Sequence, residues 1–433
     1  MQKTVGLATL GCKVSQYETE AIAEALEARG FLRRPFDEPC DLYVVNTCTV
    51  TEESDRKSRQ MIRRAHRRNP AAPIFVTGCY SQISPHEVAE IDGVVYVSGS
   101  DRKLALVERA AELLRSPPPK PLIEVGDIRE AAFEKMTVAR APRTRAYVKI
   151  EDGCECRCAY CTIPAARGAV RSKAPEDVLR EVQALVEGGT REIVLTGIET
   201  ASYGVDLGDL RLVDLLELLA RETDVERIRL GSLSPEMMTE QAVDRLARIE
   251  PLAPHFHLSM QSGSDTVLRA MRRRYLTDRA LAALSRLREA MPRVQFTTDM
   301  MVGFPGESDA LFAETEAFCR EARFLRMHVF AYSRRPGTPA ADFENQVSGQ
   351  DKHRRSARLI ALDQEIRGQI LDGVCRAKKP LSVLLETYRD GKARGHSAEF
   401  FEVEVRSDKP LHGEICSVLP LSHENGVILG QLL

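Results

Sequence analysis

The sequence lacks several features that would place it in common classes of protein. No apolar stretch approaches the roughly 20 residues that a membrane-spanning helix needs, and the N-terminus shows no basic region followed by a long apolar one. With 61 basic and 63 acidic residues the net charge is −2, which excludes a general polycation. Any nucleic-acid contact must therefore come from local basic patches. These absences predict a cytoplasmic protein without a membrane partner.

Cysteine, by contrast, is plentiful, and the number of cysteines is odd. The chain of 433 residues has 11 cysteines. An odd number in a cytoplasmic protein argues against a disulfide framework and favours metal ligands or reactive thiols. The length itself predicts two to four domains.

The first part of the chain, residues 1–115, alternates short apolar runs with helical patterns. Strands are expected at 4–10, 41–46, 74–78 and 94–98. Strands alternating with helices predict an α/β domain on a doubly wound parallel sheet. A proline-rich run begins at Ser116, and because proline cannot continue a helix or a central strand, we expect a stiff linker over 116–139.

A longer alternation of strands and helices occupies residues 140–372. Six such units in succession predict a partial (β/α)6 barrel or an open doubly wound sheet, and in both folds ligands bind at the carboxyl ends of the strands. Residues 373–433 change to short strands separated by turns, which predicts a small antiparallel β-barrel. The strands of the central domain are expected at 146–151, 192–196, 227–233, 256–261, 295–302 and 327–332.

A cysteine loop directly follows the first strand of the central domain. Cys154, Cys158 and Cys161 have the spacing C-x3-C-x2-C. Three thiolates leave one position open on a four-iron cluster or a tetrahedral zinc ion, and an open position indicates chemistry rather than scaffolding. A structural zinc ion would need a fourth ligand. Cys156 could supply one only in a strained geometry, so we expect that it is not a ligand.

This spacing resembles that of the radical S-adenosylmethionine (SAM) superfamily. The resemblance implies that the three thiolates hold a [4Fe-4S] cluster whose fourth iron binds SAM, and that an electron from the cluster cleaves SAM to a 5′-deoxyadenosyl radical. Some polar groups near strand ends are candidate contacts to SAM, although they are equally explained as structural polar residues. They are Tyr160, Gly197, Glu199, Ser259, Gln261 and Asp299.

A second set of cysteines lies in the N-terminal domain. Cys12, Cys48 and Cys79 each follow the end of an expected strand. In a parallel sheet these ends meet at one edge, so their placement predicts a second three-thiolate cluster site rather than unrelated thiols. The cysteines without such placement are expected to be ordinary small residues of the interior: Cys40, Cys319, Cys375 and Cys416.

Two three-cysteine sites followed by a β-barrel resemble the methylthiotransferase family of radical SAM enzymes over essentially the whole chain. The run Gly11-Cys12-Lys13-Val14, followed by Gln16-Tyr17-Glu18, resembles the branch that modifies N6-threonylcarbamoyladenosine in tRNA. Ser15 and Ala165 depart from that branch, which leaves details of substrate contact open. Further matching stretches are Ile163-Pro164, Arg167-Gly168, Gln261-Ser262-Gly263-Ser264-Asp265, Gly303-Phe304-Pro305-Gly306-Glu307 and Tyr332-Ser333.

The resemblance implies two [4Fe-4S] clusters and SAM as cofactors, with no catalytic residue beyond the cluster ligands. One SAM would methylate a sulfur held at the N-terminal cluster. Another would supply the radical that abstracts hydrogen from carbon 2 of the adenine ring, next to the anticodon. An electron donor such as a flavodoxin-type reductant and a sulfur donor are implied as partners, and the oligomeric state stays open.

A strongly basic helical segment follows Cys48 and is a candidate for contact with tRNA phosphates. Such a run is otherwise simply a solvated face, and Arg272-Arg273-Arg274 is a weaker candidate of the same kind. The C-terminal barrel resembles the RNA-binding TRAM module, with Lys378, Lys379, Lys392 and Arg394 nearby. The basic residues of the segment are Arg56, Lys57, Arg59, Arg63, Arg64 and Arg67.

Other functions remain open at this point. The substrate could be isopentenyladenosine in tRNA or an aspartate of a ribosomal protein, although the residues after Cys12 and the basic segment argue against the protein substrate. An iron–sulfur protein that binds RNA or transfers electrons without SAM chemistry would instead require clusters closed by four cysteines.

Overall fold

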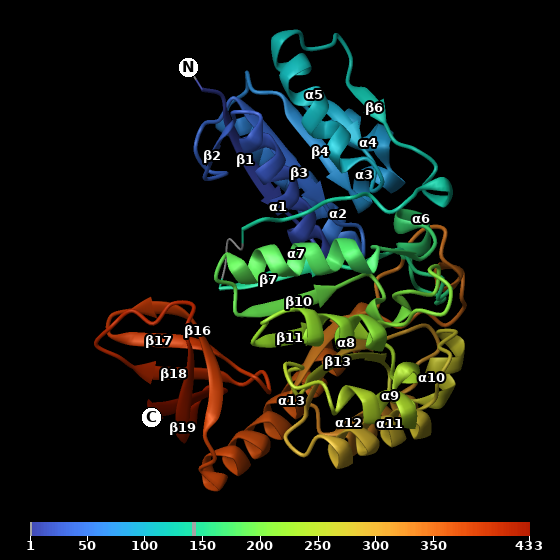
Figure 1. Cartoon of the computed structure of the whole chain (residues 1–433). Coiled ribbons are helices and arrows are strands. Elements are labelled where there is room, and N and C mark those ends of the chain that lie inside the picture. The colour runs from blue at the N-terminus through green and yellow to red at the C-terminus, as the bar shows by residue number, and fades with distance from the viewer. Residues whose placement is uncertain (1, 141–143) are drawn as a thin grey trace.

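The computed structural model describes residues 2–140 and 144–433 and arranges them in three parts (Figure 1). The N-terminal sheet lies at one end of the molecule, the central strands and their helices lie next to it, and the C-terminal strands form a separate body beside the central part. No helix within the described ranges has the length and apolar character needed to span a membrane.

The N-terminal part is a 6-stranded sheet in which every neighbouring pair of strands is parallel. Alternate residues of each strand enter two separate cores, so that Val44 faces helices α1 and α5 while Val45 faces α2 and α4. Burial on both faces explains why these strands are continuous apolar runs. The strand order is β2 (Leu32–Arg34), β1 (Thr4–Thr9), β3 (Leu42–Thr47), β4 (Ile74–Gly78), β5 (Val94–Ser98) and β6 (Leu122–Glu124); the helices are α1 (Lys13–Ala28), α2 (Glu52–Arg68), α3 (Cys79–Ile83), α4 (Pro85–Ala89) and α5 (Lys103–Arg115).

The two edge strands, β2 and β6, were not predicted. Each has only three residues, and neither is fully buried, so neither carries a clear apolar pattern. Strand β6 lies inside the range expected to be a linker, and it pairs with β5. Further along that range, Met136 and Val138 are buried in the core beside α1 and α5. Part of the expected linker is therefore folded onto the N-terminal domain.

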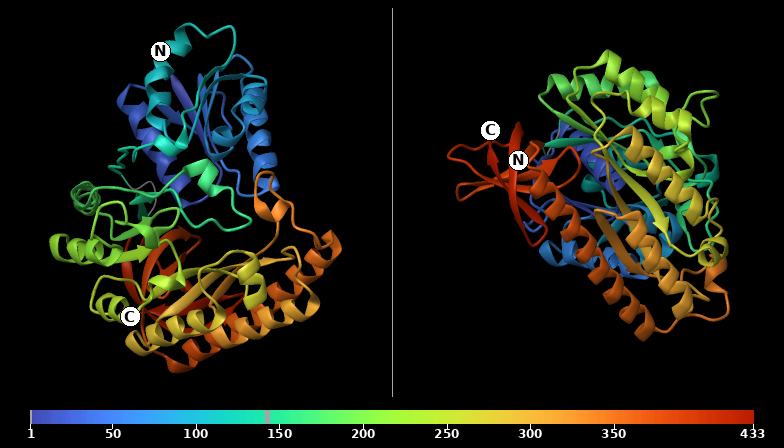
Figure 2. Two further views of the ribbon diagram at one scale, coloured as in Figure 1. Left: turned by 90° about the vertical axis from the view of Figure 1, so that its right-hand side faces the viewer. Right: turned by 90° about the horizontal axis from the view of Figure 1, so that it is seen from below.

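The central part consists of parallel strands that follow one another in chain order, with their helices on the outer side (Figure 2). Gly231 separates β11 from β12, which divides the strands into a 3-stranded and a 4-stranded sheet. The predicted partial (β/α)6 barrel is confirmed. Its strands are β7 (Arg145–Lys149), β10 (Glu192–Thr196), β11 (Arg227–Leu230) with β12 (Ser232–Leu233), β13 (His255–Gln261), β14 (Gln295–Val302) and β15 (Arg326–Ala331).

Helix α7 (Pro175–Glu187) shows why these segments form the outer layer. Pro175 stands in its first turn, where no backbone donor is lost. Val178, Val182 and Leu185 recur every three or four residues and are buried against the strands. One apolar stripe on an otherwise polar helix produces a single covering layer. The remaining helices of this part are α6 (Ile163–Arg167), α8 (Leu212–Glu222), α9 (Glu240–Leu246), α10 (Asp265–Ala270), α11 (Thr277–Ala290) and α12 (Asp309–Ala322), and a short hairpin pairs β8 (Glu151–Asp152) with β9 (Arg171–Ser172).

The long helix α13 (Gly349–Ala377) leads from the central part to a closed five-stranded barrel. The expectation of a purely antiparallel barrel needs one correction, because β18 and β20 pair in parallel. Closure brings the last strand, which runs antiparallel to β19, alongside a strand of its own direction. The barrel order is β16 (Leu381–Arg389), β17 (Lys392–Ser397), β18 (Glu402–Arg406), β20 (Val427–Leu432) and β19 (Ile415–Glu424).

Candidate functional site

Three cysteines, here called the sheet-edge set, follow the carboxyl ends of the neighbouring strands β1, β3 and β4. Cys12 precedes α1, Cys48 directly follows β3, and Cys79 begins α3. Gly11 and Gly78 have positive φ angles of 121° and 104°, which lets the chain turn sharply from strand to helix at two of the three cysteines. A Cβ atom on Gly11 would lie 3.3 Å from the Cβ of Cys48. The fold thus gathers this set at one edge, as the strand ends predicted.

The thiols of the sheet-edge set influence one another. Burial and the neighbouring Cys79 raise the pKa of Cys48 to about 11. Burial also raises the pKa of Cys79, whereas the Cys12 side chain is exposed. Thiols of this kind are protonated until a metal ion displaces the proton. Three adjoining soft donors, one of them open to the surface, fit an iron–sulfur cluster.

The second set, here called the loop set, consists of Cys154, Cys158 and Cys161 in the loop after β8. The backbone of this loop is held in place at its start, because the Cys154 N–H donates to the Gly168 carbonyl at 3.0 Å. Gly153 has a φ of 90°, and a Cβ there would collide with the Ala169 carbonyl oxygen. Only glycine fits that position, so Gly153 fixes the turn that places Cys154.

Every sulfur of the loop set accepts a hydrogen bond from nitrogen. The N–H of Cys156 donates to Cys154, and the N–H of Ile163 donates to Cys161, both at 3.4 Å. The guanidinium of Arg273 donates to the sulfur of Cys158 at 3.4 Å. Donors of this kind favour the thiolate form, but burial outweighs the Ile163 N–H and raises the pKa of Cys161 to about 12. As in the sheet-edge set, such a thiol gives up its proton when a metal binds, and three such donors fit a cluster. The sequence suggested Arg273 only as part of a weaker RNA-contact candidate, and its place beside Cys158 was not predicted because it is one of three consecutive arginines.

Neither set is drawn together as tightly as the ligands of one metal ion. Among residues 2–140 and 144–433, no group of three or more His, Cys, Asp or Glu side chains has the spacing that would hold a single ion. A four-iron cluster binds each thiolate through a different iron, so its ligands stand further apart than those of a mononuclear site. The prediction that Cys156 is not a ligand stays a prediction.

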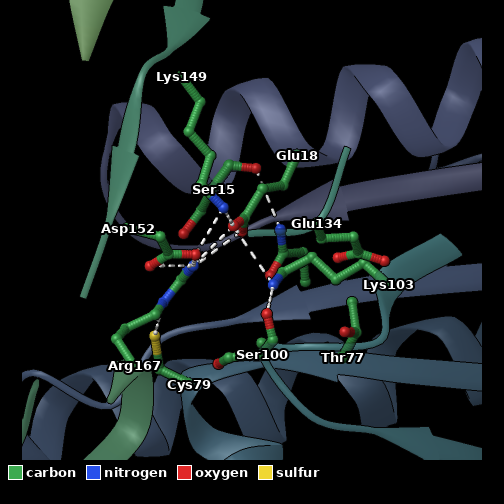
Figure 3. A network of polar contacts seen from close by, with 12 residues as sticks. Ser15, Glu18, Thr77, Cys79, Ser100, Lys103, Glu134, Lys149, Asp152 and Arg167 are labelled. Atoms are coloured by element: carbon green, nitrogen blue, oxygen red, sulfur yellow. Dashed lines mark hydrogen bonds and ion pairs between the residues drawn. The ribbon is translucent and has the colours of Figure 1, made fainter. Parts of the chain in front are cut away.

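A buried arginine contacts the sheet-edge set at Cys79 (Figure 3), and the helix that carries it begins beside the loop set. Arg167 ends helix α6, donates its Nε–H to the sulfur of Cys79 at 3.1 Å, and contacts both oxygens of Glu18 at 2.6 and 3.1 Å. The same short helix begins at Ile163, whose N–H contacts Cys161. Helix α6 therefore reaches from the loop set to the sheet-edge set.

The charges around Arg167 form a network contributed by both domains (Figure 3). Lys103 and Lys149 lie 3.3 and 2.8 Å from Glu18, and Lys149 also pairs with Asp152 at 2.6 Å. All these side chains are fully or almost fully buried. Burial alone would raise the pKa of Glu18, but the surrounding cations hold it well below its usual range. This network fixes the position of one cysteine set relative to the other. Glu18 is 131 residues from Lys149 and 149 residues from Arg167 in the sequence, and the network was not predicted.

Two of the predicted SAM contacts lie at the end of β10, close to the loop set. Glu151 occupies the space beside Gly197 and accepts the N–H of Glu199 at 2.8 Å. One carboxyl oxygen of Glu199 is buried and has no hydrogen-bond partner in the part of the chain that the structure describes. Burial and the nearby Cys156 raise the pKa of Glu199 to about 7. A buried acceptor that lacks a donor suits the positively charged groups of SAM.

Three of the other predicted SAM contacts, Asp299, Ser259 and Tyr160, contact other protein groups. Asp299 accepts hydrogen bonds from His257 at 3.1 Å and contacts His328 at 3.4 Å. Ser259 uses its carbonyl to accept from Arg273 at 2.8 Å. Tyr160 packs edge-on against Phe304 with ring centres 6.5 Å apart. Gln261 ends β13 with a φ of 68°.

A cavity of about 520 Å³ lies within the partial barrel and extends to Cys12. Of the predicted SAM contacts, Gly197 and Asp299 line it, and the other four do not. Phe400 of the C-terminal barrel also lines it, stacked on His255 with ring centres 4.4 Å apart. The cavity is thus bounded by all three parts of the molecule.

A second buried network ties the C-terminal barrel to the central strands. Glu192 pairs with Arg227 at 3.1 Å and with Arg229 at 2.9 Å, and the same carboxylate lies 3.5 Å from Arg145. Arg227 also donates to Ser382 of the C-terminal barrel at 2.8 Å. Burial would raise the pKa of Glu192, but the arginines outweigh it and lower that pKa to about 2.

The predicted basic segment forms α2, directly after Cys48. Four of the six predicted RNA contacts are paired with carboxylates: Arg56 and Lys57 with Glu53, Arg59 with Glu87, and Arg64 with Asp37. Arg68, which ends the helix, also lies 3.7 Å from Asp37. Within the described part of the chain, Arg63 and Arg67 have no such partner. Most of the positive charge that the sequence suggested is therefore neutralised locally.

Comparisons with known proteins agree with these observations. The model of the radical SAM superfamily matches residues 148–319, and that of the uncharacterized protein family UPF0004 matches residues 4–99. The chain is 40% identical to the threonylcarbamoyladenosine tRNA methylthiotransferase MtaB of Bacillus subtilis, covering 96% of this chain and 93% of the relative.

Two further similarities are more distant. The chain is 36% identical to a tRNA-2-methylthio-N6-dimethylallyladenosine synthase of Acidothermus cellulolyticus over 84% of this chain and 74% of the relative. The structure resembles that of the radical SAM methyltransferase TsrM from Kitasatospora setae, with a TM-score of 0.57 and 17% identity over 79% of this chain and 77% of that one. At that identity the likeness concerns the fold alone.

Proposed function

The chain belongs to the radical SAM methylthiotransferases, and we propose that it adds a methylthio group to carbon 2 of N6-threonylcarbamoyladenosine next to the anticodon of tRNA. The observation that carries this proposal is the pair of three-cysteine sets connected by helix α6 and Arg167. Methylthio transfer needs one site that generates a radical and another that holds sulfur, and it needs the two close together.

Enzymes of this family use SAM and two [4Fe-4S] clusters. We assign the loop set to the cluster that binds SAM and the sheet-edge set to the auxiliary cluster. When bound, these groups supply the radical and the sulfur that the side chains of the protein cannot provide. The chain itself holds the thiolates, positions them through the Arg167 network, and offers the free carboxyl oxygen of Glu199 to SAM. Gly197 and Asp299 line the cavity beside it.

The tRNA is proposed to approach over α2 and the C-terminal barrel. The exposed Arg63 and Arg67 are the cations of α2 free to neutralise phosphates, and the other four predicted residues contribute less because carboxylates already pair with them. The proposal also includes an electron donor, a sulfur donor that replenishes the auxiliary site, and a cytoplasmic location.

Mass spectrometry of tRNA nucleosides from cells that lack this protein tests the substrate. The expected result is that the methylthio group disappears from N6-threonylcarbamoyladenosine while the unmethylthiolated nucleoside accumulates. An unchanged profile would refute the proposal. Loss of methylthio from N6-dimethylallyladenosine instead would support the second candidate substrate, which the relatives that are 36% identical suggest.

Anaerobic reconstitution separates an enzyme from a non-catalytic iron–sulfur protein. The purified chain is expected to bind about eight irons, as two four-iron clusters, and to cleave SAM when reduced. Iron sufficient for one cluster, or no SAM cleavage after reduction, would favour an iron–sulfur protein that only binds RNA.

A further inference from the structure

Most of the charged side chains that line the cavity within the partial barrel are cations. Its lining includes Lys13, Arg145, Arg229 and Arg326, whereas Asp299 is its one carboxylate among the described residues. The N-terminal domain, the central strands and the C-terminal barrel all contribute to the wall. A cavity of about 520 Å³ is large enough for a small organic group. Which of these cations already has a carboxylate partner decides whether the wall attracts an anionic group.

The arginines of this wall are already paired with protein carboxylates. Arg145 and Arg229 share Glu192, and Arg145 also contacts Glu386 of the C-terminal barrel. Arg326 lies 3.3 Å from Glu402. These arginines shape the wall, but their charge is largely balanced.

Lys13 differs from those arginines. Within the described residues, no carboxylate lies within 4 Å of its ammonium group and no hydrogen bond holds it; Asp299 acts on it only from further away. Asp299 is itself occupied by His257 and His328. A half-buried ammonium without a counter-charge is costly. Lys13 is therefore the group of this wall that a bound anion would stabilise most.

Two neighbouring features of α1 also favour an anionic group. Lys13 is the first residue of the helix, and its first turn has no acidic residue and no side-chain cap. Backbone N–H groups at a helix start therefore add to the positive potential. One turn along, Gln16 lines the cavity, and its side-chain oxygen is buried without a hydrogen-bond partner among the described residues. It offers an acceptor for a hydroxyl or N–H group.

We propose that Lys13 binds the carboxylate of the N6-threonylcarbamoyl group and thereby selects this base over one that carries a dimethylallyl group. The inference rests on the proposed function. A threonylcarbamoyl substituent ends in a carboxylate and a hydroxyl, which match Lys13 and Gln16. A dimethylallyl substituent is a hydrocarbon, and it would leave both groups desolvated without partners. Because Lys13 directly follows Cys12, a base held through this substituent lies beside the auxiliary site.

Three anticodon stem-loop RNAs test the proposal with the reconstituted full-length protein under anaerobic conditions. They carry N6-threonylcarbamoyladenosine, the same base with its carboxylate converted to a carboxamide, and N6-dimethylallyladenosine. Fluorescence anisotropy gives the Kd of each RNA, and steady-state assays give KM and kcat. We expect the wild-type protein to bind the carboxylate roughly 10- to 100-fold more tightly than the carboxamide, as for a hydrogen bond between charged groups.

Variants then assign the preference to the side chain. Lys13→Gln is expected to weaken binding of the carboxylate RNA to the level of the carboxamide RNA, with little change for the latter. Lys13→Arg should retain most of the preference. Lys135→Gln removes an exposed lysine outside the cavity and should change nothing. Iron is counted for each variant, because Lys13 adjoins a cluster cysteine.

Several outcomes would overturn the inference. The first is that the wild-type protein binds the carboxylate RNA and the carboxamide RNA equally well. This result needs no variant, so it holds even if Lys13→Gln does not load iron. Lys13→Gln could retain the wild-type preference, or it could raise the KM for SAM while leaving the preference between RNAs intact. If the wild-type protein methylthiolates none of the threonylcarbamoyl RNA, the proposed function itself fails, which is a separate result.

Discussion

The two cysteine sets are assembled in opposite ways. The loop set comes from one short segment whose backbone turns at Gly153, and its sulfurs accept hydrogen bonds from nearby N–H groups and from Arg273. The sheet-edge set comes from the ends of three separate strands, and a buried network shared by two domains contacts it through Arg167. The first depends on local conformation and the second on tertiary packing. Local damage should therefore affect them differently.

The largest expected effect comes from removing one thiolate from either set. Cys154→Ala should reduce iron from about eight to about four per chain and abolish SAM cleavage. Cys79→Ala should cause the same loss of iron but retain SAM cleavage, while methylthio transfer disappears. Iron analysis, detection of 5′-deoxyadenosine and nucleoside mass spectrometry measure the three quantities. Cys375→Ala, which lies outside both sets, is the control and should leave all of them unchanged.

The second comparison tests the contacts that support each set. Arg167→Met leaves Glu18 and Asp152 buried without their main partner, so the free energy of unfolding should fall by about 3–5 kcal/mol. Arg273→Met removes a half-buried side chain that contacts a carbonyl, a tyrosine and a thiol but no carboxylate. The free energy of unfolding of this variant should fall by about 1–2 kcal/mol. Anaerobic urea unfolding measures both variants. If both variants lose the same free energy of unfolding, the two sets do not differ in how far they depend on tertiary packing.

The contrast between the sets also explains what could be predicted from sequence. The loop set is visible in the C-x3-C-x2-C spacing because the whole site is local. The sheet-edge set required the strand ends to be located first, and it was found because Gly11-Cys12 and Gly78-Cys79 follow strands of clear apolar pattern. The six central strands were predicted for the same reason.

Features that depend on distant pairs were not predictable. Arg167 and Glu18 are 149 residues apart in sequence, and nothing in either segment marks a charged side chain as fully buried. The pairing of Arg64 with Asp37 likewise neutralises a charge that the sequence presents as free. Strand β6 was not predicted because an edge strand of three residues is too short to show a periodic apolar pattern.

A pH series on a single variant tests the network around Glu192, which contacts neither set. The pKa of Glu192 is about 2 in the folded protein and about 4.5 in the unfolded chain, so its stabilising effect is present above pH 4.5 and is lost as the pH falls towards 2. The full effect corresponds to about 3 kcal/mol. The difference in unfolding free energy between wild type and Glu192→Gln should therefore shrink over that range. A difference that is constant with pH would contradict the ion-pair assignment.

The smallest expected effect concerns the surface beside the sheet-edge set. Arg63 and Arg67 lack carboxylate partners in the described residues, whereas Arg56 is bound to Glu53 at 2.5 Å. Replacing Arg63 and Arg67 together with Gln should weaken tRNA binding several-fold and lower the slope of log Kd against log salt by about one for each lost phosphate contact. Arg56→Gln is the matched control, and it should change the slope less because its charge is already balanced. If Arg56→Gln has the larger effect, RNA displaces the carboxylate on binding, and the local ion pairs of α2 do not limit which cations reach the phosphates.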